Sequence, residues 1–406
     1  MKVFGTHDEH TLAQLRAVAK RAVTVALMAD GHRGYVMPIG GVAAYEGQVS
    51  PIGVGVDIAC GNAAIRTNLT AEEIRPHLDE LADEIAATIG FGLDRPENTA
   101  ADAPVGHPLF ESSAWDAVPD AGTREELRAR ARTQLGTVGG GNHYVDVFAD
   151  EEGRVWVGVH FGSRGLGFIS AHGYVALAQG QEWKGLQPQR LADMNREVLL
   201  DLGTPLGDAY WSLMTLAGEY AYAGREWVAR KVVGILGGSE VELVHNHHNF
   251  AWKEPHGGRE LVVVRKGATP AFPGQRGFVG GSMGDPSVIL RGAAETDTAA
   301  SALFSTVHGA GRVMGRMQAK GKWKRGRLIR PGRITHDDWA DWLDRVGVVL
   351  RGGDLDEAPQ AYRRLGDVLA AQGDTIVIEH KLDPLIVVMA PARTAGPSLR
   401  ARGPAR

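Results

Sequence analysis

The sequence predicts a mixed α/β fold in a single compact domain that spans residues 1–390. Segments with helical spacing of apolar residues alternate along the chain with short runs of β-branched residues. Six glycine-rich segments, several of them containing histidine, lie between residues 53 and 312. Glycine lets the backbone approach a ligand closely, so we expect these segments to surround one site assembled from the whole chain. That expectation argues against two independent domains.

Capping signals and apolar spacing predict the helices. A threonine followed three residues later by glutamate is a capping box, and the chain contains this signal at Thr70–Glu73 and at Thr123–Glu126. Apolar residues continue at helical spacing after the first signal as far as Ile89. The segments 188–230 and 336–350 have the same spacing and are also predicted to be helical.

Short runs rich in β-branched residues predict the strands. These runs are 155–160, 241–245, 261–265, 375–379 and 385–389. Several of them lead directly into a glycine- or histidine-rich segment, where a rigid scaffold presents a site. The last residues, 391–406, contain four arginines, three prolines and no acidic residue, which predicts a disordered basic tail.

The overall composition is that of an ordinary globular protein. Of 406 residues, 44% are hydrophobic and 23% are charged, which excludes the disordered and fibrous classes. A single cysteine allows no intrachain disulfide and indicates a reducing, cytoplasmic setting. No apolar run approaches the roughly 20 residues that span a bilayer, so no membrane association is expected.

Potential metal ligands gather in the glycine-rich segments. Histidine, carboxylate and thiolate together suit zinc, manganese, cobalt or iron, and the sequence does not choose among them. No CxxC pair is present, which favours an open, catalytic site, and more than four donors suggest two ions bridged by the thiolate. Taken singly, a cysteine is more often a small buried hydrophobe, and a histidine is more often structural. The donors are Asp57, Cys60, His143, His160, His248 and His308.

Two further segments, GGSMGDPS (280–287) and HGAGR (308–312), expose successive backbone N–H groups that suit a phosphate. The segment 312–333 holds nine lysines and arginines and no acidic residue, which indicates a nucleic-acid surface. Tight turns and a solvated basic loop are the alternatives. The residues expected to contact nucleic acid are Arg312, Arg316, Lys320, Lys322, Trp323, Lys324 and Arg325.

Seven of these motifs occur together in one known family. DIACG, GGGNHYVDV, VHFGSRGLG, HHN, RKGA, GSMG and HGAGR appear in the order and spacing of the RtcB family of RNA-splicing ligases, which the chain resembles from residue 28 to about residue 389. The resemblance implies antiparallel sheets flanked by helices around a deep metal and nucleotide cleft. It also implies an enzyme that uses GTP and two Mn²⁺ ions to join RNA ending in a 2′,3′-cyclic phosphate or 3′-phosphate to RNA with a 5′-hydroxyl.

The resemblance assigns roles that spacing alone leaves open. The positions that match manganese ligands are Asp57, Cys60, His143, His160 and His248, with Cys60 placed to bridge both ions. His308 matches the nucleophile that forms a covalent histidine–GMP intermediate. The positions that match nucleotide-contacting segments are Asn142, His143, Tyr144, Val145, Asp146, His248, Asn249, Gly280, Gly281, Ser282, Met283, Ser287, His308, Gly309, Ala310 and Gly311.

Two positions depart from the family pattern, and both concern recognition of the guanine base. The family's NHxxE reads NHYVD here, so Asp146 stands for a glutamate. The family chain usually ends in Lys-Gly after an apolar strand, whereas here the strand reaches Met389 and continues. We therefore expect metal binding and nucleotidyl transfer to be retained more fully than strict preference for GTP.

Three other functions remain as alternatives. A diverged ligase would act on other ends, including DNA, or use another nucleotide. A binuclear metal phosphoesterase would need the same ligands but neither His308 nor a guanine pocket. A non-catalytic RNA-binding protein would use the basic segment alone, and the intact set of metal donors argues against it. The physiological RNA and the need for an activating protein partner stay open.

Overall fold

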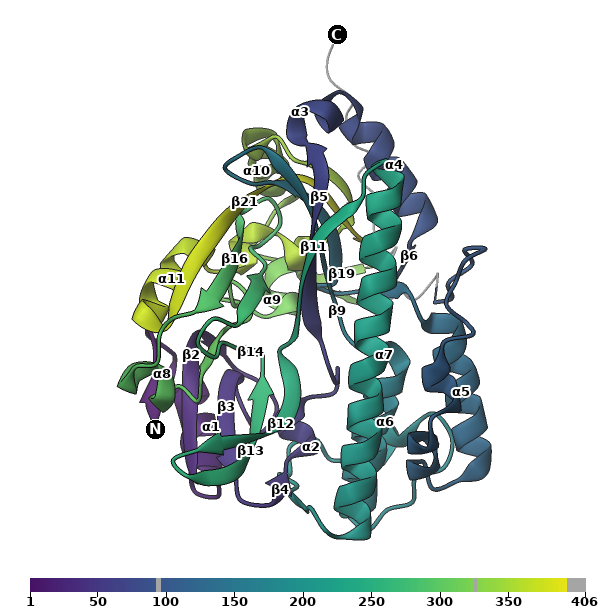
Figure 1. Cartoon of the computed structure of the whole chain (residues 1–406), viewed down its shortest axis with the longest axis vertical. Helices are drawn as coiled ribbons and strands as arrows, with labels where there is room; N and C mark the ends of the chain where they lie inside the picture. The colour runs from purple at the N-terminus through teal and green to yellow at the C-terminus, as the bar shows by residue number, and fades with distance from the viewer. Residues whose placement is uncertain (93–95, 325–326, 393–406) are drawn as a thin grey trace.

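Two mainly antiparallel sheets carry most of the strands (Figure 1). The computed structural model describes residues 1–92, 96–324 and 327–392. The five-stranded sheet has the order β1 (Lys2–Val3), β2 (Thr24–His32), β3 (Ile39–Tyr45), β13 (Arg259–Lys266) and β12 (Asn249–His256). Only the short β1 runs parallel to its neighbour in this sheet.

The second, larger sheet contains eight strands. Its main order is β11 (Glu240–His247), β5 (Gly61–Thr70), β9 (Arg154–Phe161), β8 (Tyr144–Ala149), β21 (Ile376–Pro391), β16 (Ser287–Gly292) and β15 (Arg276–Val279). The eighth strand, β20 (Val349–Gly353), pairs in parallel with β21. The described two-stranded pairs are β4 (Gln48–Val49) with β10 (Leu200–Asp201), β6 (Gly90–Phe91) with β7 (Thr137–Gly139), β14 (Ala268–Pro270) with β17 (Ser305–Val307), and β18 (Lys322–Lys324) with β19 (Arg327–Arg330).

Helices surround the sheets. They are α1 (Glu9–Ala19), α2 (Pro51–Val54), α3 (Ala71–Ile74), α4 (Leu78–Thr88), α5 (Ala121–Gln134), α6 (Arg164–Ala178), α7 (Pro205–Ile235), α8 (Asp297–Ser301), α9 (Arg316–Lys320), α10 (His336–Val346) and α11 (Leu365–Gln372). Figure 1 shows the long α7 running beside β11 and β5, with α6 and α5 on its far side. The predicted mixed α/β class with antiparallel sheets is therefore confirmed.

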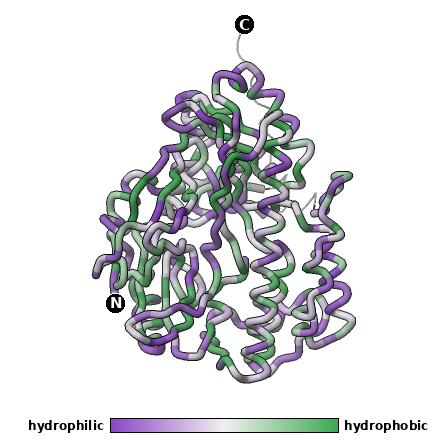
Figure 2. The backbone as a smooth tube through the Cα atoms, in the orientation of Figure 1, coloured by the Kyte–Doolittle hydropathy of each residue, from purple (hydrophilic) through white to green (hydrophobic). Residues whose placement is uncertain are grey.

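The core forms where α7 packs on the eight-stranded sheet. Val228 and Val232 of α7 are buried in one cluster with Ile65 of β5 and Val157 of β9. Figure 2 shows hydrophobic residues along these inner strands and a largely hydrophilic α5 at the periphery. Burying such side chains contributes roughly 1.5–3 kcal/mol each, which makes this packing a major source of stability.

Three predicted helices have different limits in the structure. Asp120, not Thr123, caps α5, because its carboxylate accepts from the backbone N–H of Thr123 three residues on. The predicted helix 188–230 begins only at Pro205, after Thr204 caps it. The predicted helix 336–350 ends at Val346, because Gly347 adopts the left-handed conformation (φ 67°) that terminates helices.

The first capping box is confirmed, but its helix is short. Thr70 and Glu73 cap α3, which ends at Ile74. A 3₁₀ turn over Arg75–His77 then precedes α4. Pro76 has no N–H to continue the helical hydrogen-bond pattern, so the predicted single helix is divided.

The strand predictions agree with the structure except at the C-terminal end. The predicted strands 155–160, 241–245 and 261–265 lie within β9, β11 and β13. The runs 375–379 and 385–389 instead belong almost entirely to one strand, β21. A register shift at Pro384 accommodates the proline, which lacks a ladder donor, so the strand continues through it.

Two sequence predictions concern membrane association and the C-terminal tail. Within the described ranges, we find no helix with the length and apolar character required for crossing a bilayer. Of the predicted basic tail, residues 393–406 lie outside the described residues.

Removal of the N-cap of α7 tests where this helix begins. We expect Thr204→Ala to lower the free energy of unfolding by about 1 kcal/mol, because the Thr204 hydroxyl accepts from the N–H of Gly207. Chemical denaturation measures the change. Thr215→Ala, in the exposed middle of α7, is the matched control. It should not lower the free energy of unfolding, because alanine has the higher helix propensity. Equal losses in both variants would contradict this assignment of the helix start.

Candidate functional site

Cys60 lies in a tight turn between α2 and β5. Its backbone N–H donates to the carbonyl of Asp57 at 3.0 Å, which closes the turn that carries both side chains. The next residue must be glycine, because a Cβ at Gly61 would lie 2.2 Å from the carbonyl oxygen of Asn246 on β11. The lone cysteine is therefore held next to a point where β5 approaches β11 too closely for any side chain.

Cys60, His143 and His160 form a cluster of potential metal ligands. The Cys60 Sγ atom lies 3.7 Å from the Nε2 atoms of both histidines, and all three atoms lie within 4.8 Å of one another. The Nδ1 atom of His143 donates to the carbonyl of Val138, and that of His160 donates to Oδ1 of Asn62. Because these oxygens only accept, each Nε2 is the ring nitrogen that faces Cys60 and can bind a metal once it holds no proton.

Two other predicted ligands adjoin the cluster. Oδ2 of Asp57 lies 3.0 Å from Nε2 of His143. The ring of His248 lies 5.1 Å from that of His160, and its buried Nδ1 atom has no hydrogen-bond partner. Thiolate, imidazole and carboxylate groups that converge in this way fit a borderline divalent metal. The structure thus brings together all five residues that the sequence proposed as ligands.

Burial sets the protonation of the cluster. Burial and the charge of Asp57 raise the pKa of the Cys60 thiol well above its usual value. Burial and neighbouring cations lower the pKa values of His160 and His248 well below the usual value. Burial opposes ionisation of Asp57, but the hydrogen bond and charge of His143 outweigh it and lower the pKa. At neutral pH these two histidines are neutral and the thiol holds its proton.

Metal binding should therefore release a proton from Cys60. We expect uptake of a divalent metal such as Mn²⁺ at pH 7 to release about one proton, with affinity rising about tenfold per pH unit. Titration calorimetry in two buffers of different ionisation enthalpy measures the release. Cys60→Ala should bind the metal more weakly and release no proton. Undiminished release in that variant would show that another group loses the proton.

His308 lies at the end of β17, beside the cluster. Its ring centroid is 4.9 Å from that of His248. Nδ1 of His308 lies 2.6 Å from Oδ2 of Asp30, a fully buried residue of β2. The same carboxylate oxygen accepts the backbone N–H groups of His308 and Gly309. Asp30 therefore engages Nδ1 and leaves Nε2 as the reactive atom.

No sequence motif assigns Asp30 a role. Its segment, MADGHRG, belongs to the stretch that resembles the family, and that was the only available signal. Asp30 is 278 residues from His308 in the chain. Only the folded structure shows their contact.

A cavity of about 300 Å³ opens in front of His308. The glycine-rich segments 280–283 and 308–311 form one wall, and a backbone bridge joins Gly280 to Gly309. A Cβ at Gly280 would lie 2.0 Å from the Tyr144 hydroxyl, so glycine is required there. The predicted nucleotide-contacting residues that line the cavity are Asn142, Tyr144, Asp146, Gly280, Gly281, Ser282, Met283, His308, Gly309, Ala310 and Gly311.

The other predicted nucleotide residues lie behind the cavity wall. The Ser287 hydroxyl accepts the N–H of Gly281 and so supports the loop. Asn249 donates to the carbonyl of Asp57 and accepts from the N–H of Gly267. His143 and His248 belong to the ligand cluster, and Val145 is buried in the core on the other face of the sheet. In the structure these residues support the walls instead of lining the cavity.

The two departures from the family pattern meet in the cavity. Asp146 and Met389 both line it, from the neighbouring strands β8 and β21. Asp146 is buried, its Oδ1 atom has no hydrogen-bond partner, and burial raises its pKa well above the usual value. The cavity thus contains an acceptor that a ligand with N–H groups would satisfy.

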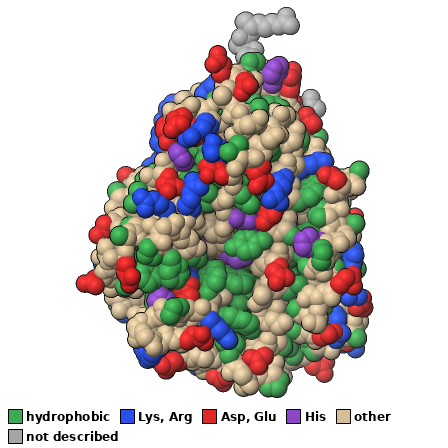
Figure 3. Space-filling model, in the orientation of Figure 1, with side chains coloured by type: hydrophobic (Ala, Val, Ile, Leu, Met, Phe, Trp, Pro, Cys, Tyr) green, Lys and Arg blue, Asp and Glu red, His purple; other side chains and the backbone are tan. Residues whose placement is uncertain are grey.

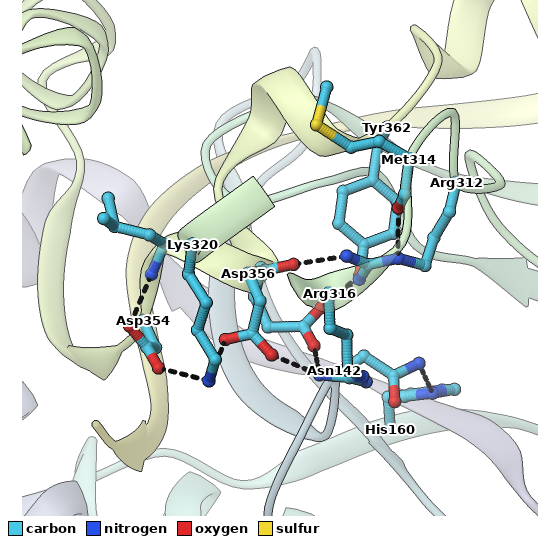
Figure 4. A network of polar contacts seen from close by, with 11 residues as sticks. Asn142, His160, Arg312, Met314, Arg316, Lys320, Asp354, Asp356 and Tyr362 are labelled. Atoms are coloured by element: carbon cyan, nitrogen blue, oxygen red, sulfur yellow. Dashed lines mark hydrogen bonds and ion pairs between the residues drawn. The ribbon is translucent and has the colours of Figure 1, made fainter. Parts of the chain in front are cut away.

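The basic segment is less positive than its sequence indicates. Carboxylates of residues 354–357 pair with three of its cations, which Figure 4 shows beside Asn142 and His160. Arg312 donates to Glu357 and the Tyr362 hydroxyl, Arg316 pairs with Asp356 and Glu357, and Lys320 pairs with Asp354 and Asp356. These three residues thus have carboxylate partners, and their contact with nucleic acid stays a prediction.

The remaining residues predicted to contact nucleic acid are 322–325. Lys322 is exposed at the start of β18. Trp323 and Lys324 belong to the same strand, and Arg325 lies outside the described residues. On the face seen in Figure 3, acidic and basic side chains are interspersed.

This architecture defines a mixed α/β protein in which a cysteine–histidine cluster borders a glycine-walled cavity. The family model described as tRNA-splicing ligase RtcB matches residues 10–390. The RNA-splicing ligase RtcB of Escherichia coli K12 is 31% identical over 392 residues, which cover 90% of this chain and 89% of that protein. The tRNA-splicing ligase RtcB of Archaeoglobus fulgidus is 32% identical over 414 residues, covering 84% and 82%.

A further archaeal relative agrees with these two. The tRNA-splicing ligase RtcB of Thermococcus kodakarensis is 31% identical over 428 residues, covering 88% of this chain and 85% of that protein. The chain belongs to the RtcB family.

Proposed function

We propose that the protein is a manganese-dependent, GTP-using RNA ligase. It joins ends that carry a 2′,3′-cyclic phosphate or a 3′-phosphate to ends that carry a 5′-hydroxyl, through a covalent histidine–GMP intermediate. The observation that carries the proposal is the position of His308, held by Asp30 at the cavity and one ring away from the metal-ligand cluster. The ligase names of its relatives support the reaction class.

His308 begins the reaction as a nucleophile. Its Nε2 lone pair attacks the α-phosphorus of GTP, an N–P bond forms, and the bond to the β-phosphate oxygen breaks with loss of pyrophosphate. The carboxylate of Asp30, 2.6 Å from Nδ1 of His308, stabilises the positive charge that the ring acquires. The N–H groups of Gly281, His308 and Gly309 already donate to Ser287 and Asp30, so the phosphate oxygens would bind the other N–H groups of the cavity wall.

Two transfers complete the ligation. An oxygen of the RNA 3′-phosphate attacks the phosphorus bound to His308, and the N–P bond breaks, which returns the histidine. A cyclic phosphate is first opened by water to a 3′-phosphate. The 5′-hydroxyl then attacks the RNA phosphate, its proton leaves, and GMP is released. Phosphoryl transfer of this kind depends mainly on position and charge stabilisation.

Asp57, Cys60, His143, His160 and His248 would hold two Mn²⁺ ions in this proposal. When bound, the ions neutralise charge on the phosphoryl oxygens. In this proposal the Cys60 thiolate would serve both ions, and its 3.7 Å distances from His143 and His160 support that role. A thiolate ligand requires cysteine in its reduced form, which agrees with a reducing, cytoplasmic setting.

Broken RNA ends or tRNA halves are the proposed substrate. Lys322 and its neighbours in β18 are the proposed contacts with RNA, since Arg312, Arg316 and Lys320 already have carboxylate partners. An activating protein partner would be compatible with this reaction but has no assigned surface.

The first step can be tested directly. We expect the protein with Mn²⁺ and α-³²P-labelled GTP to acquire an acid-labile covalent label, and His308→Ala to acquire none. Asp30→Asn should slow labelling about 10- to 100-fold, because it removes the carboxylate charge that lies 2.6 Å from Nδ1 of His308. Absence of label in metal-loaded wild-type protein would overturn the ligase proposal and favour the phosphoesterase.

Asp146 offers a test of base choice. Guanine has N–H groups on its Watson–Crick edge that can donate to a carboxylate. Because these hydrogen bonds stabilise the charged form, a bound guanine would favour ionised Asp146. We expect Asp146→Ala to lower the ratio of GTP to ATP labelling by about tenfold, the equivalent of one hydrogen bond. Asp383→Ala, an exposed acid on β21, is the matched control. An unchanged ratio would show that Asp146 does not read the base.

A further inference from the structure

Arg225 is a fully buried cation directly behind the metal-ligand cluster. It lies in the second half of α7 and has 0% of its surface exposed. Its hydrogen-bond partners in the described part of the chain are backbone carbonyls and imidazoles, with no carboxylate among them. A buried arginine without a carboxylate partner costs stability, so its presence requires another explanation.

One nitrogen of Arg225 connects the segments that carry two predicted ligands. Nη1 donates to the carbonyl of Ala59 at 2.8 Å and to that of Phe161 at 2.6 Å. Ala59 immediately precedes Cys60, and Phe161 immediately follows His160. A single donor group therefore sets how far apart these two backbone segments lie.

The other nitrogens reach the strand that leads to a third ligand. Nη2 of Arg225 donates to Nδ1 of His247 at 2.9 Å, and Nε donates to Nε2 of His245 at 2.8 Å. His247 immediately precedes His248, whose backbone N–H donates to the carbonyl of Cys60. One planar guanidinium thus contacts neighbours of Cys60, His160 and His248.

The packing around Arg225 leaves little freedom. A Cβ at Gly61 would lie 3.1 Å from its Nη2 atom, so the chain approaches the guanidinium closely. Tyr222 stacks on His247, with ring centroids 3.9 Å apart, and fixes that acceptor. His245 in turn lies 3.6 Å from Glu226, which orients its other nitrogen. Arginine suits this position because its donors have a fixed planar arrangement, which the single ammonium of lysine lacks.

We propose that Arg225 is a positioning residue that sets the spacing of Cys60, His160 and His248 for metal binding. The inference rests on the proposed metal site but not on the ligation chemistry. Its effect is on the geometry of the ligands, through hydrogen bonds to residues adjacent to each of them.

The test uses Co²⁺, because a cobalt–thiolate bond has a near-ultraviolet charge-transfer absorption that reports on Cys60 directly. We expect Arg225→Lys to weaken Co²⁺ and Mn²⁺ binding about 10- to 100-fold, the usual effect of losing a group that orients a ligand, and to reduce the charge-transfer band. The melting temperature of the metal-free protein is measured in parallel.

Arg265→Lys is the matched control. Arg265 is equally buried, and its partners are Glu254, Ser305 and the carbonyl of Leu303, none of which adjoins a predicted ligand. We expect this variant to lose thermal stability but to keep the affinity and the cobalt spectrum. Wild-type affinity and spectrum in Arg225→Lys would overturn the proposal, as would equal losses of metal affinity in both variants.

His245 provides a second test if Arg225→Lys does not fold. His245→Leu removes one acceptor of Arg225 near the surface and should weaken metal binding and the cobalt band. His245→Gln keeps an acceptor oxygen and should restore both. Equal metal binding in these two variants would overturn the proposal. Wild-type protein that binds Co²⁺ through Cys60 but acquires no GTP label would overturn only the ligase proposal.

Discussion

The register of four antiparallel strands decides where the site residues lie. Gly61 at the start of β5 pairs with Phe161 at the end of β9 and with His247 at the end of β11. One residue along, His160 of β9 pairs with Asn62 of β5 on one side and with Tyr144 of β8 on the other. Side chains alternate along a strand, so a slip of one residue would turn His160 away from Cys60. The close approach at Gly61 and the donors of Arg225 both hold this register.

The contact between Asp30 and His308 joins the five-stranded sheet to the segment that follows β17. The ligand cluster lies at the neighbouring ends of β5 and β9 in the eight-stranded sheet, and His308 is one ring away from it, so this contact helps to align the nucleophile with the metal ligands. Charge is distributed unequally around the site. The cations of residues 312–320 have carboxylate partners from residues 354–357, but Arg225 has only neutral ones. The cations at the rim of the cavity are therefore neutralised, whereas the charge of Arg225 lies behind the ligand cluster and outside the cavity lining.

Local signals predicted the elements that depend on local interactions. The strands 155–160 and 261–265 and the capping box at Thr70 required only β-branched composition and a short hydrogen-bond pattern. The predicted ends of helices were wrong where a nearby residue provides the cap. At α5, for example, Asp120 caps the helix before Thr123. The two C-terminal runs form one strand because β16 and β8 continue the pairing on either side of Pro384, and the sequence near the proline does not contain that information.

The sequence by itself determined which residue types are available: a single cysteine, histidines beside glycines, and an ordered series of motifs sufficient to identify the family. These are properties of composition and order, and they need no fold. Tertiary structure decided the contacts between Asp30 and His308 and between Arg225 and its partners, and the neutralisation of Arg312, Arg316 and Lys320. Each of these links residues far apart in the chain, and only the packing of sheets and helices sets the distances on which charge and hydrogen bonding depend.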